Sequence, residues 1–275
     1  MDDIPNCSVA DRIILELIND EDVHIEQLSE MIQENPSLAA LIIGLANSAY
    51  FSSPTSIHTV RDAAIKVLGM RMVKSVVLSV VLGRSLDTSK CPNFSTIHYW
   101  TNCLTTARFC QMILQQSHFR KMVTSDEMYL CALLAGFGEL VLIHHYPEEM
   151  NELISACEGD LELYVNSQSS LLGIHQGQAG VLMGSRWVLP PRVLVTMQHC
   201  FNEDYQGQDS HLSSIVGDVS KLVNRINRGE TELNFSPKVQ DILELTATNS
   251  KSLLEQLPEL RCDLEAIAQH LMSKA

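Results

Sequence analysis

The sequence LCALLAGFGELVL occupies residues 130–142. Large apolar side chains recur in it at helical spacing, which predicts a helix with one apolar face made of Leu130, Leu133, Leu134, Phe137, Leu140 and Val141. Small residues occupy the opposite face, and Glu139 is the only charged residue. A helix that is apolar on nearly every side is typical of the centre of a helical bundle. We therefore expect one continuous core helix from about residue 125 to residue 145.

Two glycines, Gly136 and Gly138, fall inside this predicted helix. A glycine in a helix costs about 1 kcal/mol relative to alanine. The cost is acceptable where a second backbone must approach closely, because glycine has no side chain to obstruct it. The two glycines therefore predict a close contact between this helix and another one.

The sequence before this stretch also predicts helices. Asn35-Pro36 ends one helix and starts the next, since proline is well placed in a first helical turn. Thr59 is a candidate helix cap, and Gly69 fits the position just after a helix end. These signals place several short helices before residue 90.

Helical patterns continue to the C-terminus, and the alternation typical of strands is not present anywhere in the sequence. The most loop-like interval is SLDTSKCPNFS, residues 85–95. We therefore predict an all-α protein with two parts, an N-terminal helical subdomain over residues 1–90 and a second helical subdomain over residues 91–275.

Composition narrows the class of function. The net charge is −14, and the chain has no dense run of Lys and Arg, which disfavours binding to nucleic acid. The apolar runs at 38–46 and 76–82 are shorter than the roughly 20 residues that span a bilayer. None of the eight cysteines forms a Cys-x-x-Cys pair, and the first residues lack the layout of a signal peptide. We expect a reduced, cytoplasmic protein that binds neither nucleic acid nor membrane.

Three short motifs occur in order in the N-terminal part: Asn35-Pro36, Ala46-Asn47-Ser48-Ala49 and Leu68-Gly69. Together they resemble the HDOD family, the HD-related output domains of bacterial signalling. Residues 130–142, here called the core stretch, are similar to the central segment of the parent HD superfamily. The members of that superfamily are metal-dependent phosphohydrolases. The resemblance covers about residues 10–210 and implies an N-terminal helical bundle packed on an HD-like helical subdomain.

The resemblance also identifies the positions of the HD metal site, and three of them lack the expected ligands. Ala135 and Gly136 stand where the superfamily has its metal-binding His-Asp pair. Asn102, shortly after Trp100, stands at or near the place of the first histidine. Without the cation, the Lewis acid and the activated water of such a hydrolase are lost. We therefore predict no metal, no cofactor and no catalytic residue.

Two histidines resemble those of the family's downstream stretch. His175 and His199 flank the segment Trp187-Val188-Leu189-Pro190. They are candidates for a residual ligand-binding pocket, and together with His144 and His145 they could hold an ion. The alternative, which we favour, is that His175 and His199 are partly buried and hydrogen-bonded structural residues.

The other residues of the family motifs are expected to be structural. Asn47 and Ser48 lie late in an apolar helix, where polar side chains need partners. We expect them to lock the N-terminal helices, and we expect Trp187 to lie in the core. Asn35, Pro36, Gly69 and Pro190 complete this structural set.

The sequence therefore favours a non-catalytic regulatory module of bacterial signal transduction. Because no fused partner domain is visible, its protein partner, a signalling component, would bind in trans. Two alternatives remain open. One is a degenerate phosphohydrolase that uses the remaining histidines, which predicts a bound metal. The other is a nucleotide or small-molecule sensor, which predicts a deep pocket near Ala135, Gly136 and His175.

Overall fold

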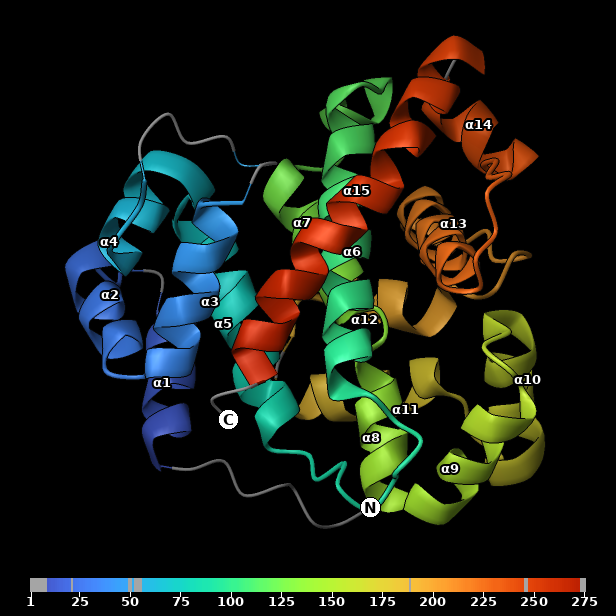
Figure 1. Cartoon of the computed structure of the whole chain (residues 1–275), viewed down its shortest axis with the longest axis horizontal. Helices are drawn as coiled ribbons and strands as arrows, with labels where there is room; N and C mark the ends of the chain where they lie inside the picture. Colours follow the sequence, from blue (N-terminus) through green and yellow to red (C-terminus); the bar gives the residue numbers. More distant parts are fainter. Residues whose placement is uncertain are drawn as a thin grey trace. The chain divides into compact units, whose positions relative to one another are not determined.

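The computed structural model describes residues 9–272, except residues 21, 49–50, 52–55, 188 and 245–246. These described residues contain helices and turns but no strand, so the prediction of an all-α fold is confirmed (Figure 1). The chain divides into two compact units. The first contains the described residues of Met1–Leu86, Thr96–Thr101 and Cys262–Ala275, and the second contains Asp87–Ser95 and Asn102–Arg261. The predicted subdomain boundary at residue 90 stays a prediction.

The first unit is built mainly from short helices. They are α1 (Val9–Asn19), α2 (Ile25–Gln33), α3 (Pro36–Ala46), α4 (Val60–Ala63), a π-helical turn (Ala64–Leu68) and α5 (Met70–Arg84). The predicted caps are present, because Asn35 and Thr59 accept hydrogen bonds from the backbone N–H groups of Leu38 and Asp62. Gly69, with φ of 79°, separates the π-helical turn from α5. The sequence signals at Asn35, Thr59 and Gly69 therefore marked helix ends correctly.

The second unit holds most of the remaining helices. They are α7 (Ser125–Leu134), α8 (Phe137–His145), α9 (Pro147–Ala156), α10 (Leu161–Leu172), α11 (Gln176–Arg186), α12 (Pro191–His199), α13 (Ser210–Asn227) and α14 (Pro237–Leu243). Two long helices, α6 (Thr96–Gln115) and α15 (Ala247–Met272), have residues in both units. The largest fully buried side chains of the second unit include Phe109, Tyr129 and Phe137. Hydrophobic burial around α6, α7 and α8 therefore forms the core of this unit.

The expectation of one continuous helix over residues 125–145 is wrong in one respect. The helix is interrupted at Ala135 and Gly136, so that α7 ends at Leu134 and α8 begins at Phe137. Gly136 has φ of −87° and ψ of 2°, outside the helical region, and its carbonyl accepts a hydrogen bond from the N–H of Glu139 at 3.0 Å. These backbone angles are those of an ordinary turn, and the apolar periodicity of the sequence does not reveal it.

The same stretch has the length and apolar character of a membrane span. Over Ser125–His145, however, 72% of the most apolar window is buried inside the protein. The turn at Ala135 and Gly136 also divides the stretch into two helices of 10 and 9 residues. Its apolar side chains are therefore accounted for by the core of the second unit.

Candidate functional site

Two of the positions that the family resemblance assigns to the HD metal site, Ala135 and Gly136, form the junction of α7 and α8. α7 begins with a capping box, in which Thr124 and Glu127 satisfy each other's backbone N–H groups. The helix runs from this cap to Ala135, which is 2% exposed, and Gly136 follows in the turn. Neither residue has a side-chain atom that can bind a cation.

Immediately after this turn, the backbone of α8 meets that of α11. A Cβ atom at Gly138 would lie 1.7 Å from the carbonyl oxygen of Gln176 and 2.5 Å from the backbone nitrogen of Gly180. No side chain fits in that space, so Gly138 is required by the contact. The close approach predicted from the glycines is thus present at Gly138, and it fixes the first turn of α11 against α8.

His175 is held at the start of α11 by two hydrogen bonds. Its Nδ1 accepts from the N–H of Gly177 at 3.0 Å, and its own N–H donates to the side chain of Gln178 at 3.1 Å. Burial, followed by the nearby imidazole of His199, lowers the pKa of His175. A neutral imidazole that accepts at Nδ1 carries its proton on Nε2, so neither nitrogen then has a lone pair for a metal.

His199 is the last residue of α12 and stacks on Tyr205. The two ring centroids are 3.7 Å apart and the rings are almost parallel, with an angle of 2°. Burial lowers the pKa of His199, which favours the neutral ring. The structure therefore brings His199 near His175 and gives each ring a structural contact; the ligand role of the pair stays a prediction.

Asn102, on α6, belongs to a chain of polar side chains that the sequence did not reveal. Its Oδ1 accepts from the Nδ2 of Asn227 on α13 at 3.0 Å. The Oδ1 of Asn227 accepts in turn from Nε of Arg261 on α15. The side-chain oxygen of Asn102 is therefore already used inside the second unit.

These residues do not fit the divalent-metal centre of the HD superfamily. Across the part of the chain that the structure describes, no group of three or more His, Cys, Asp or Glu side chains is placed to hold an ion. His144 instead accepts from the N–H of Asp87 at 2.9 Å and packs edge-to-face on His145. The cluster of four histidines considered from the sequence is therefore not formed.

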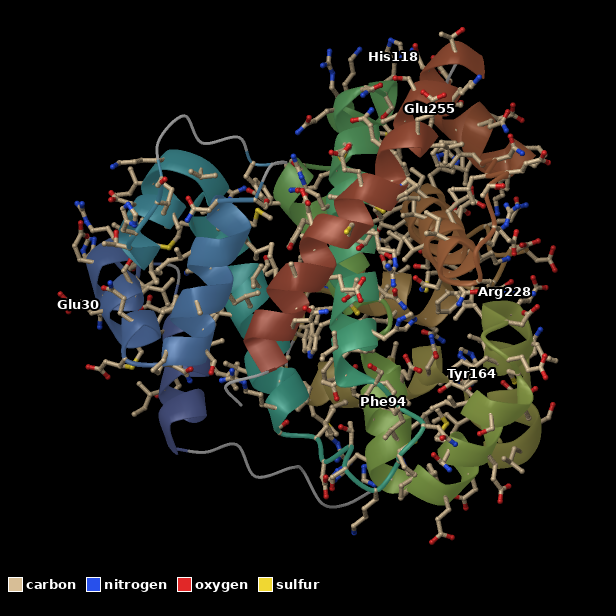
Figure 2. All side chains as sticks on the ribbon, viewed as in Figure 1. Glu30, Phe94, His118, Tyr164, Arg228 and Glu255 are labelled. Atoms are coloured by element: carbon tan, nitrogen blue, oxygen red, sulfur yellow. The ribbon has the colours of Figure 1, made fainter. Side chains whose placement is uncertain are left out.

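The core stretch does contain one partly buried acid, Glu139, with an unusual environment. The hydroxyl of Tyr164, labelled in Figure 2, donates to Oε1 of Glu139 at 2.9 Å. Burial raises the pKa of Glu139 from its ordinary value of 4.5 to about 7, although the hydrogen bond from Tyr164 opposes the rise. Beside this pair, Gln168 exchanges two hydrogen bonds with Gln176, of 2.9 and 3.1 Å. Sequence reasoning noted the lone charge of Glu139 and missed these partners, which lie 25 or more residues away.

The structural motif residues lie in both units. Asn47 follows α3 and binds both backbone groups of Ile57, donating to its carbonyl at 2.7 Å and accepting from its N–H at 2.8 Å. Ser48 donates to the carbonyl of Leu45 at 2.8 Å. Asn47 therefore joins the end of α3 to the segment before α4, and Ala49 lies outside the described residues.

The Trp-x-Leu-Pro segment connects α11 to α12. Trp187 packs edge-to-face on Phe137, with ring centroids 5.4 Å apart, but it is half-buried and therefore not a full core residue. Pro190 precedes α12, and its carbonyl accepts from the N–H of Val193 at 2.9 Å. Val188 lies outside the described residues.

Comparison with known proteins identifies the same family as the sequence motifs. The model of the HDOD domain matches residues 4–202. An uncharacterized protein of Treponema pallidum (strain Nichols) is 24% identical over 240 residues, which cover 86% of this chain and 45% of that protein. The chain thus spans about half the length of that curated relative.

Solved structures share the fold. A chain named a candidate signal transduction protein, from Marinobacter aquaeolei VT8, is similar with a TM-score of 0.76 and 21% identity over 98% of this chain and 60% of that one. A candidate phosphohydrolase from Shewanella amazonensis SB2B has a TM-score of 0.72 and 20% identity over 98% of this chain and 95% of that one. At such identities the similarity shows a shared fold.

Proposed function

Because this chain belongs to the HDOD family, we propose that it is a non-catalytic regulatory module of signal transduction that acts by binding a protein partner in trans. The observation that carries the proposal is the junction of α7 and α8. Ala135 and Gly136 offer no ligand atoms there, and the side-chain oxygen of Asn102 is already bound to Asn227. A hydrolase of the HD type needs a cation to activate water, and this set of residues offers no site for one.

The name of the Marinobacter relative supports a signalling function, whereas that of the Shewanella relative suggests phosphohydrolysis. The donor atoms of this chain favour the signalling function. A divalent cation at an HD-type site requires several His or carboxylate ligands that converge from separate helices. His175 and His199 alone supply two imidazoles, of which one has its Nδ1 occupied by the N–H of Gly177.

Elemental analysis of the purified, dialysed protein tests this proposal, with a His175→Ala/His199→Ala double variant beside it. We expect less than one tenth of an equivalent of Mn, Fe, Ni or Zn in either protein, and no hydrolysis of bis-p-nitrophenyl phosphate when these metals are added. Near-stoichiometric metal in the wild type that is absent from the double variant, together with hydrolysis, would establish the degenerate phosphohydrolase instead.

A further inference from the structure

A cleft of about 840 Å³ lies in the second unit, far along the sequence from the residues discussed above. Its walls are the C-terminal end of α13, the non-helical segment Glu230–Phe235, and the first part of α15 from Ser250 to Pro258. Ile226, Leu233 and Leu254 contribute apolar surface. The volume lies within the range of about 300–1,000 Å³ that is typical of ligand sites.

Two polar groups on the α15 side of the cleft lack their usual partners. Ser250 is 9% exposed, and its buried hydroxyl has no hydrogen-bond partner among the described residues. Pro258 lies inside α15 and has no N–H, so the carbonyl of Leu254 loses its normal helical donor. Buried polar groups are normally hydrogen-bonded, and both groups belong to residues that line the cleft.

The opposite wall carries free backbone groups. Arg225 holds one end of Glu230–Phe235, because it donates to the Glu230 carboxylate at 2.6 Å and to the Glu232 carbonyl at 2.7 Å. At the other end, Gln240 donates to the carbonyl of Phe235 at 2.8 Å. Between these anchors, the three residues Thr231, Leu233 and Asn234 make no hydrogen bond to any described residue. This segment is fixed at both ends while the backbone between them can pair with a ligand.

The charge of the cleft is negative. Glu230 is paired with Arg225, and Glu255 lies 4.0 Å from Lys251, whereas Glu232 has no ion pair with a described residue. Three carboxylates and one ammonium group line the cleft, and the whole chain carries a net charge of −14. The long-range field of such a protein attracts cations, and Glu232 is the carboxylate free to pair with one.

We propose that this cleft binds an extended basic segment of a partner protein, with basic and apolar residues in alternation. The main chain of the segment pairs with residues 231–234, one basic side chain meets Glu232, and the apolar side chains cover Leu233 and Leu254. Addition of an extended peptide to free backbone groups is a common mode of recognition. This inference rests on the proposed function, because both take the protein to act by binding a partner.

Fluorescence anisotropy with the full chain tests the inference. The probe is a fluorescein-labelled heptapeptide of alternating Lys and Val, whose extended form places the two residue types on opposite faces. We expect saturable binding of this probe and none of the matching Glu-Val peptide. We also expect Glu232→Lys to weaken binding about tenfold, because it replaces one attraction with a repulsion.

Two controls separate the cleft from general charge attraction. Glu152→Lys makes the same charge change on the exposed face of α9 and should leave the affinity unchanged. A probe N-methylated at its valines keeps its charge but loses N–H donors, and it should bind about tenfold more weakly if the backbone pairs. Equal affinities for wild type and Glu232→Lys, equal weakening by both lysine variants, or no effect of N-methylation would each overturn the inference. Metal content and hydrolysis are separate readouts, so failure of the proposed function would be recognised independently.

Discussion

The partly buried acid of the core stretch, Glu139, leads to a quantitative prediction about stability and pH. Burial raises the pKa of Glu139 from 4.5 to about 7 in the folded protein. Between these two values the unfolded chain is ionised while the folded chain keeps its proton, so folding becomes less favourable as the pH rises. Below 4.5 both states are protonated, and above 7 both are ionised and the full penalty is present. One pKa unit corresponds to about 1.4 kcal/mol, so the full penalty is about 3 kcal/mol.

Glu139→Gln removes this ionisation and keeps an oxygen that accepts from Tyr164. The difference in free energy of unfolding between this variant and the wild type should therefore shift in favour of the variant by about 2.5 kcal/mol from pH 5 to pH 8. The assay is urea denaturation followed by circular dichroism at 222 nm at four pH values. His175 and His199, whose pKa values are lowered by burial, also affect stability in this range, but they are present in both proteins and cancel in the difference.

Glu152→Gln is the matched control, because Glu152 lies exposed on α9 and its carboxylate is solvated in both states. The difference in free energy of unfolding between Glu152→Gln and the wild type should not change between pH 5 and pH 8. If the difference in free energy of unfolding between Glu139→Gln and the wild type proves equally constant with pH, then the carboxyl of Glu139 is solvated in the folded protein. That result would refute the reasoning from its burial.

Three further substitutions test the packing within each unit. Gly138→Ala should destabilise the protein by at least about 3 kcal/mol in urea denaturation, because the new Cβ overlaps backbone atoms of α11. At Gly44 on α3, the nearest atom to a new Cβ would be 3.9 Å away, so Gly44→Ala should be neutral or stabilise the protein by up to about 1 kcal/mol. Equal effects of Gly138→Ala and Gly44→Ala would contradict the close contact between α8 and α11. Asn47→Ala should cost about 2 kcal/mol, since it leaves both backbone groups of Ile57 unpaired; a melting temperature within 1 °C of the wild type would contradict this.

Helix ends were predictable wherever a local chemical signal marks them. Asn35, Thr59 and Gly69 all occupy the end positions that their residue types favour. The turn at Gly136 was not predictable in the same way, because the apolar spacing continues through it. Gly138 shows the opposite case, in which the cost of a glycine inside a helix correctly indicated a neighbouring backbone.

Contacts between distant residues could not be predicted from spacing alone. Nothing local links Glu139 to Tyr164, and the lone charge of the core stretch was the only available indication. The cleft was not predicted, because its walls come from separate segments, among them the first part of α15, where Pro258 falls inside the helix. Leu253, Leu257 and Leu260, all buried, follow helical spacing through this proline and could have revealed the helix.

The residues at the three positions that the family resemblance assigns to the metal site are physically consistent with one another. Ionised ligands held together in a buried site repel each other and lose hydration unless a cation neutralises them. Ala135 and Gly136 bring no charge, and Asn102 brings a neutral amide whose oxygen is satisfied by Asn227, which in turn accepts from Arg261. This arrangement needs no cation for its stability. Replacing Asn102 alone by histidine would break the bond to Asn227 without assembling a ligand set, so a metal centre would require changes at all three positions together.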